Sequence, residues 1–112
     1  MEKIKKTTEI LKELGVPANV KGYEVLRSAI CMVIDDFQLV YHITTKLYPA
    51  LAKQFESTPS RMERAIRYAI ETGWYRGNYE TQQKLFSYSY DAKKGKPTNG
   101  EFIAAIADYI RL

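Results

Sequence analysis

The sequence is poor in the residues that build disulfide bonds, metal sites and catalytic centres. It has one cysteine, Cys31, and one histidine, His42, in 112 residues. A single cysteine cannot form an internal disulfide, and within the apolar run "AICMVI" it is typical of a small buried hydrophobe, so we expect a reducing compartment. A single histidine and the absence of a CxxC pair exclude the common zinc sites. We therefore expect no metal and no cofactor.

Long apolar runs and phosphate-binding glycine motifs are missing as well. No apolar stretch approaches the roughly 20 residues of a membrane-spanning helix, and the start "MEKIKKTTEI" lacks the apolar core of a signal peptide. The glycines are scattered, and "GKPT" does not have the P-loop frame. No nucleophile, base and oxyanion-stabilising group can be assembled into one set. The sequence therefore predicts a cytoplasmic protein that is not an enzyme and has no membrane partner.

The chain does have a basic charge balance and a helical apolar pattern. Its formal net charge of +4 favours an anionic partner without identifying one. Its length and its hydrophobic content of 46% suit one globular domain, which we assign to residues 1–112. Apolar residues recur at three- and four-residue spacing, and no segment alternates strictly. We therefore predict an all-α fold, a compact bundle of about six helices.

Turn and capping residues predict where the first helices lie. The first is expected from about Lys3 to Leu14, with Ile4 and Leu11 on its buried side, and Gly15 then supplies a stop. A second helix from about Gly22 has the apolar face of a central core element: Tyr23, Leu26, Ile30, Val33, Ile34 and Phe37. Because proline suits a first helical turn, "YPALAKQF" is expected to be a separate short helix.

Two more helices are expected in the last third of the chain. A weak helix covers about Glu80 to Phe86. In "TNGE", Thr98 as N-cap and Glu101 three residues later form a capping box. The final helix that follows has the apolar residues Phe102, Ile103, Ile106, Tyr109 and Ile110.

The helix predicted in "STPSRMERAIRYAIETGW", ending near Gly73 or Gly77, has a basic side. A rotation of about 100° per residue places these residues on one side: Met62, Ala65, Ile66, Ala69, Ile70 and Gly73. The opposite side has Ser60, Arg64, Arg67, Tyr68 and Glu71, with Arg61 and Glu63 at its edges. A guanidinium can pair with both acceptors of guanine, and a carboxylate can accept from the cytosine amino group. The start of this helix is therefore a candidate reading surface for the major groove.

The short helix before it favours a helix-turn-helix. Leu51 and Phe55 are four residues apart, and the small Ala52 allows two helices to approach closely. The turn "ESTPS" has a suitable length, although Glu56 or Ser57 stands where a glycine is often found. Arginines at three-residue spacing are equally typical of a solvated helix face, so the spacing alone leaves both interpretations open.

Two N-caps are compatible with the start of the charged helix. If Ser60 is the N-cap, "SRME" is a capping box and the Glu63 carboxylate turns back to the backbone. If Thr58 is the N-cap and Pro59 is the first helical residue, Glu63 is free. We favour Thr58 because proline is common at the first helical position.

Four runs of the sequence point to a known family. The runs "GVPANVKGYEVLRSAICMV", "LYPALAKQFESTPSRMERAIRYAIETGW", "RGN" and "KPTNGEFIAAIAD" closely resemble the DNA-binding effector domain of the stage-zero sporulation response regulator of endospore-forming bacteria. The resemblance covers nearly the whole chain in the same order. It implies a transcription regulator whose helix-turn-helix reads a TGTCGAA-type box in double-stranded DNA. It also implies tandem boxes occupied by neighbouring domains. For the arginine side of the charged helix, it favours contact with DNA over a merely solvated helix face.

The resemblance extends to individual residues. It implies that "YPALAKQF" is the positioning helix and that the recognition helix runs from Ser60 onward. The implied base-reading residues are Arg61, Glu63 and Arg64, and the implied backbone or flanking contacts are Thr58, Ser60 and Arg67. Family members place a phosphorylatable receiver domain before this one. The sequence begins directly on the first effector helix, so we expect no receiver domain in it and no sensing of phosphorylation by it alone.

Two further expectations concern the region after the charged helix. The resemblance implies a surface facing the RNA polymerase sigma factor near Phe86 and Tyr90, where "FSYSY" departs from the family pattern. An alternative function is a protein-interaction module that docks the sigma factor or a regulator through this region, including Tyr88, without specific DNA binding. The basic loop residues either contact DNA phosphates or are simply solvated: Lys93, Lys94 and Lys96.

Overall fold

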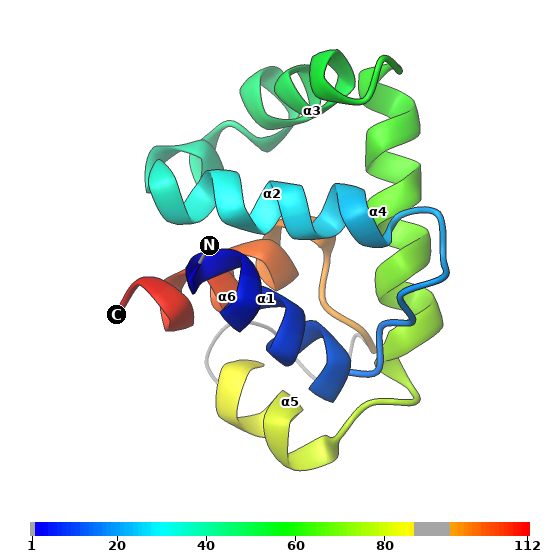
Figure 1. Cartoon of the computed structure of the whole chain (residues 1–112), viewed down its shortest axis with the longest axis vertical. Coiled ribbons are helices and arrows are strands. Elements are labelled where there is room, and N and C mark those ends of the chain that lie inside the picture. Colours follow the sequence, from blue (N-terminus) through cyan, green and yellow to red (C-terminus); the bar gives the residue numbers. More distant parts are fainter. Residues whose placement is uncertain (1, 87–94) are drawn as a thin grey trace.

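Helices account for the regular structure in the part of the chain that the computed structural model describes, residues 2–86 and 95–112. The α-helices are α1 (Glu2–Glu13), α2 (Tyr23–Asp35), α3 (Tyr48–Gln54), α4 (Pro59–Trp74), α5 (Tyr79–Phe86) and α6 (Asn99–Arg111). A 3-10 turn, η1 (Phe37–Tyr41), and a π-helical turn, η2 (Ile43–Leu47), lead from α2 into α3. The predicted all-α bundle is confirmed (Figure 1).

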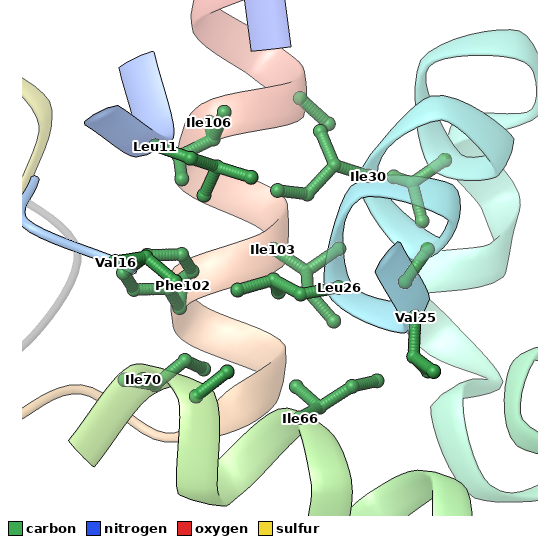
Figure 2. Packing of buried hydrophobic residues seen from close by; sticks show 14 of the residues in the cluster. Leu11, Val16, Val25, Leu26, Ile30, Ile66, Ile70, Phe102, Ile103 and Ile106 are labelled. Carbon is green, nitrogen blue, oxygen red and sulfur yellow. The ribbon is translucent and has the colours of Figure 1, made fainter. Parts of the chain in front are cut away.

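The core is built around α2 and α6, which pack against each other inside the molecule. Leu26 and Ile30 of α2 lie beside Ile103 and Ile106 of α6, and all four side chains are fully buried (Figure 2). Ile66 adds a buried side chain from α4 to the same cluster. Fully burying an aliphatic side chain of this size contributes about 1.5 to 3 kcal/mol relative to leaving it in water. The prediction that the second helix is the central core element is confirmed.

Two residues predicted to face the core are exposed instead. The buried side of α1 is centred on Thr7, Ile10 and Leu11, so Ile4 falls at its edge and is 41% exposed. Tyr109 of α6 is 45% exposed, and its ring faces the ammonium group of Lys84 on α5, 4.9 Å from the ring centroid. An aromatic ring beside a cation can remain partly in water because this contact does not require burial.

The expected surface position of Phe86 is wrong. This last residue of α5 is only 2% exposed. Its ring stacks on Phe102 of α6 at a centroid distance of 5.4 Å and meets the edge of Trp74 of α4 at 5.2 Å. Aromatic pairs at such distances stabilise a core beyond the area that they bury. Phe86 therefore joins α5 to the bundle and is not available to a partner.

Two glycines hold α4 close to the rest of the bundle. Gly22 caps α2, and a Cβ atom at this position would lie 1.9 Å from the carbonyl oxygen of Ala65 in α4. A Cβ atom at Gly73, near the end of α4, would lie 2.8 Å from the Cα atom of Val16. No larger residue fits either contact without a shift of the backbone. The start of α4 extends past α2 to meet α3 at one end of the molecule (Figure 1).

Candidate nucleic-acid interface

The predicted division of α4 into a buried and an exposed side is confirmed. The buried residues are Met62, Ile66, Ala69, Ile70, Gly73 and Trp74. The exposed residues include Ser60, Arg61, Arg64, Arg67, Tyr68 and Glu71. Because the buried side fills the core, the orientation of the arginine side toward solvent is fixed by the hydrophobic packing of the whole bundle.

The turn between α3 and α4 is a Schellman motif, and its left-handed position is occupied by glutamate. The Ser57 N–H donates to the Ala52 carbonyl at 2.9 Å, and the Glu56 N–H donates to the Lys53 carbonyl at 3.5 Å. These bonds end α3. Glu56 has φ 51, the region in which glycine is usually found. The missing glycine therefore does not prevent the turn, and α3 packs against α4 as in a helix-turn-helix.

Thr58 is the N-cap of α4, as favoured above. Its hydroxyl oxygen accepts a hydrogen bond from the Arg61 N–H at 3.2 Å, and Pro59 is the first helical residue. The alternative in which Ser60 caps the helix is thereby excluded. The Glu63 carboxylate is consequently not used for capping.

Glu63 pairs instead with Arg67, one turn further along α4. The distance from the Arg67 guanidinium to the Glu63 carboxylate is 3.2 Å, and both side chains are partly exposed. An exposed pair of this spacing contributes only about 0.3 to 0.5 kcal/mol to helix stability. The pair is therefore weak enough to exchange for contacts with a ligand, while it holds the Glu63 carboxylate on the outer part of the helix.

Arg61 and Arg64, near the start of α4, have no carboxylate partner among the described residues, unlike Arg67. Neither forms a salt bridge with any residue that the structure describes, and the Arg64 Nε–H donates a long hydrogen bond to the Ser60 carbonyl oxygen at 3.4 Å. Both side chains line a hollow of about 550 Å³ between α4, the α3–α4 turn and the start of α2. Lys21 lines the same hollow, as do the carboxylates Glu24 and Glu56. Exposed guanidinium groups without a carboxylate partner are suited to bind phosphate or base edges.

Three exposed lysines in the segments around the α3–α4 pair were not identified from the sequence as site residues. Lys21 precedes α2, whereas Lys46 and Lys53 lie in η2 and α3, seven residues apart. A helix that precedes a recognition helix crosses the DNA backbone in known complexes.

Of the predicted phosphate contacts before α6, Lys96 lies within the described residues. Lys96 is half-buried, and its ammonium group lies 3.7 Å from the Glu71 carboxylate of α4. Lys96 is thus adjacent to α4. Lys93 and Lys94, and the aromatic residues Tyr88 and Tyr90, lie outside the described residues.

Other kinds of site find no support in the described ranges, 2–86 and 95–112. No three histidine, cysteine, aspartate or glutamate side chains lie together there in a way that could hold a metal ion. His42 is exposed between η1 and η2. None of the helices described combines the length and the apolar character needed to span a bilayer.

A helical bundle in which a short turn leads into an amphipathic helix with an exposed arginine side is consistent with a helix-turn-helix DNA-binding domain. The family model described as "Sporulation initiation factor Spo0A C terminal" matches residues 7–110. The chain belongs to this family. It is a DNA-binding effector domain of the sporulation response-regulator type, which acts in the regulation of transcription.

Proposed function

We propose that the protein recognises a TGTCGAA-type box in double-stranded DNA by inserting the start of α4 into the major groove. The observation that carries this proposal is the state of Arg61 and Arg64, which are exposed, adjacent on the helix and without a carboxylate partner among the described residues. Each guanidinium can donate two hydrogen bonds to the O6 and N7 atoms of a guanine. The Glu63 carboxylate, released from Arg67, accepts from a cytosine amino group.

The remaining cations and hydroxyl groups bind the DNA backbone. Thr58, Ser60 and Arg67 flank the base-reading residues, and we assign them to phosphate or flanking contacts. Lys96 lies beside α4, and we assign Lys93, Lys94 and Lys96 to phosphate contacts as well. Phosphate contacts supply affinity and orientation, whereas base contacts supply the choice of site.

Two partners besides DNA belong to the same proposal. Tandem boxes would bring two copies of this domain side by side. The RNA polymerase sigma factor would approach near α5, which begins with the 70% exposed Tyr79 even though it ends with the buried Phe86. Residues 1–112 would act as one domain in the cytoplasm, where bacterial regulators of this kind bind DNA.

The test is a fluorescence-anisotropy titration of a TGTCGAA duplex and a scrambled duplex of equal length and composition, repeated at two salt concentrations. Tighter binding to the box, and a steep loss of affinity for both duplexes with added salt, support major-groove reading by a basic surface. Equal affinity for the two duplexes would overturn the proposal of specific recognition. No binding to either duplex would favour the protein-interaction alternative.

A further inference from the structure

The first residue of α6 connects three helices through a single amide group. The Asn99 Nδ2 atom donates a hydrogen bond to the Tyr48 hydroxyl oxygen at 3.0 Å and another to the Glu63 backbone carbonyl at 3.0 Å. Tyr48 is the first residue of α3, and Glu63 lies in the second turn of α4. The two donors of one carboxamide group therefore bridge the two helices of the helix-turn-helix.

The backbone on both sides of Asn99 is held by hydrogen bonds at the start of α6. The capping box of α6 places the Glu101 N–H 3.1 Å from the Thr98 hydroxyl oxygen and the Thr98 N–H 2.8 Å from the Glu101 carboxylate. These reciprocal bonds hold the backbone on both sides of Asn99. α6 is in turn anchored in the core by Ile103 and Phe102. The helix that bears the Asn99 amide group is thus anchored in the hydrophobic core.

The segment before α6 contacts α4 at two places and leaves Arg61 and Arg64 open. Asn99 meets the Glu63 carbonyl, and Lys96 reaches the Glu71 carboxylate two turns further along the same helix. The segment from Lys96 to Asn99 therefore follows one flank of α4. Arg61 and Arg64 lie away from this flank, on the hollow beside α2.

We propose that Asn99 is a positioning residue for the choice of DNA site: it fixes the orientation of α4 relative to α3, and thereby the geometry in which the α4 side chains meet base edges. This inference rests on the proposed function. Paired hydrogen bonds to a base edge require fixed distances and angles, whereas contacts with phosphates around the duplex tolerate small shifts. The loss of Asn99 should therefore reduce discrimination between sites more than it reduces binding to DNA in general.

The test compares Asn99→Ala with Asn19→Ala, which changes an exposed asparagine in the loop after α1. Dissociation constants are measured on the TGTCGAA duplex and on the scrambled duplex. The discrimination ratio is the dissociation constant for the scrambled duplex divided by that for the TGTCGAA duplex. For Asn99→Ala we expect this ratio to fall by about tenfold, which is within the range of one lost base contact. The dissociation constant for the scrambled duplex should stay nearly unchanged. Asn19→Ala should retain the ratio of the unmodified protein.

Two further variants separate positioning from loss of stability. Tyr48→Phe removes one of the two acceptors of Asn99 and should lower the ratio by a smaller factor, which also tests the inference if Asn99→Ala does not fold. Ile106→Val weakens the core away from the helix-turn-helix and should lower the melting temperature while leaving the ratio unchanged.

The outcomes distinguish this inference from the function on which it rests. If the unmodified protein binds both duplexes equally, the proposed function fails. If the unmodified protein prefers the TGTCGAA duplex, and Asn99→Ala and Tyr48→Phe both keep this preference in full, the positioning role is wrong. An equal loss of affinity on both duplexes, with the ratio preserved, would also overturn it because a purely structural role predicts that result.

Discussion

The Thr58 hydroxyl oxygen accepts a hydrogen bond from the Arg61 N–H at 3.2 Å, so the N-cap residue of α4 is bonded to the first arginine of its exposed side. The cap satisfies a backbone donor that would otherwise have no partner within the helix. It also fixes the backbone of the turn from which Arg61 and Arg64 extend. Helix formation and the presentation of the arginine side therefore depend on the same hydroxyl group.

Replacing Thr58 with alanine should destabilise the protein by about 0.5 to 2 kcal/mol, because the cap of α4 is lost while the buried core is untouched. Urea unfolding followed by circular dichroism measures this difference. Thr58→Ser is the matched control because it retains the hydroxyl group and should stay close to the unmodified protein. If the two variants are equally destabilised, the hydroxyl contact does not cap α4.

Replacing Glu56 with glycine should stabilise the protein by about 0.5 to 1 kcal/mol. A non-glycine residue in the left-handed region costs roughly 1 to 2 kcal/mol, and the extra flexibility of glycine in the unfolded chain offsets part of the gain. The midpoint of thermal unfolding measures the effect. Glu56→Ala removes the same carboxylate but keeps the Cβ atom, so it should show no such gain; a gain equal to that of glycine would mean that charge, and not φ 51, is the cause.

Replacing Gly22 with alanine should destabilise the protein by about 1 to 3 kcal/mol or more, because the added Cβ atom would overlap the Ala65 carbonyl and force α2 and α4 apart. Gly100→Ala is the control. A Cβ atom at Gly100, inside α6, would meet only the Ile43 Cγ1 atom, at 3.8 Å. Chemical unfolding of both variants should place Gly22→Ala well below Gly100→Ala, and equal stability would contradict the close approach.

The stability of the protein should decrease in alkali partly through Tyr48. Burial raises the pKa of the Tyr48 hydroxyl above its usual value of 10.0, and the hydrogen bond from Asn99 opposes this shift in part. A group whose pKa is higher in the folded state stabilises the fold below the unfolded pKa and loses this effect as the pH rises through the folded pKa. The midpoint of urea unfolding should therefore fall more steeply above about pH 10 in the unmodified protein than in Tyr48→Phe. Parallel curves would show that the Tyr48 environment does not disfavour ionisation.

Local patterns in the sequence were sufficient to predict the helices and the two sides of α4. The four-residue spacing of Met62, Ile66 and Ile70 predicted the buried side, and Pro59 correctly favoured Thr58 as the N-cap. The capping box of Thr98 and Glu101 is confirmed as well. Each of these features depends on residues within a few positions of one another, where helix geometry determines the result.

Features that depend on distant residues were missed. Phe86 could not be recognised as a core residue because its aromatic partner Phe102 belongs to another helix. Asn99 had no visible role because its contact with Glu63 joins residues 36 positions apart. Such contacts are set by how the helices cross, and a periodic pattern within one helix contains no information about crossing.

The most direct test of base reading by α4 combines Arg64→Ala with single substitutions of the guanines in the TGTCGAA box. We expect the variant to lose about 1 to 3 kcal/mol of binding free energy on the intact box and to become insensitive to substitution at one guanine only. Arg64→Lys should also lose this preference, because an ammonium group cannot pair with both acceptors. If Arg64→Ala weakens binding to the box and to scrambled duplex by the same factor and retains every base preference, Arg64 contacts phosphate alone and base reading by this residue is contradicted.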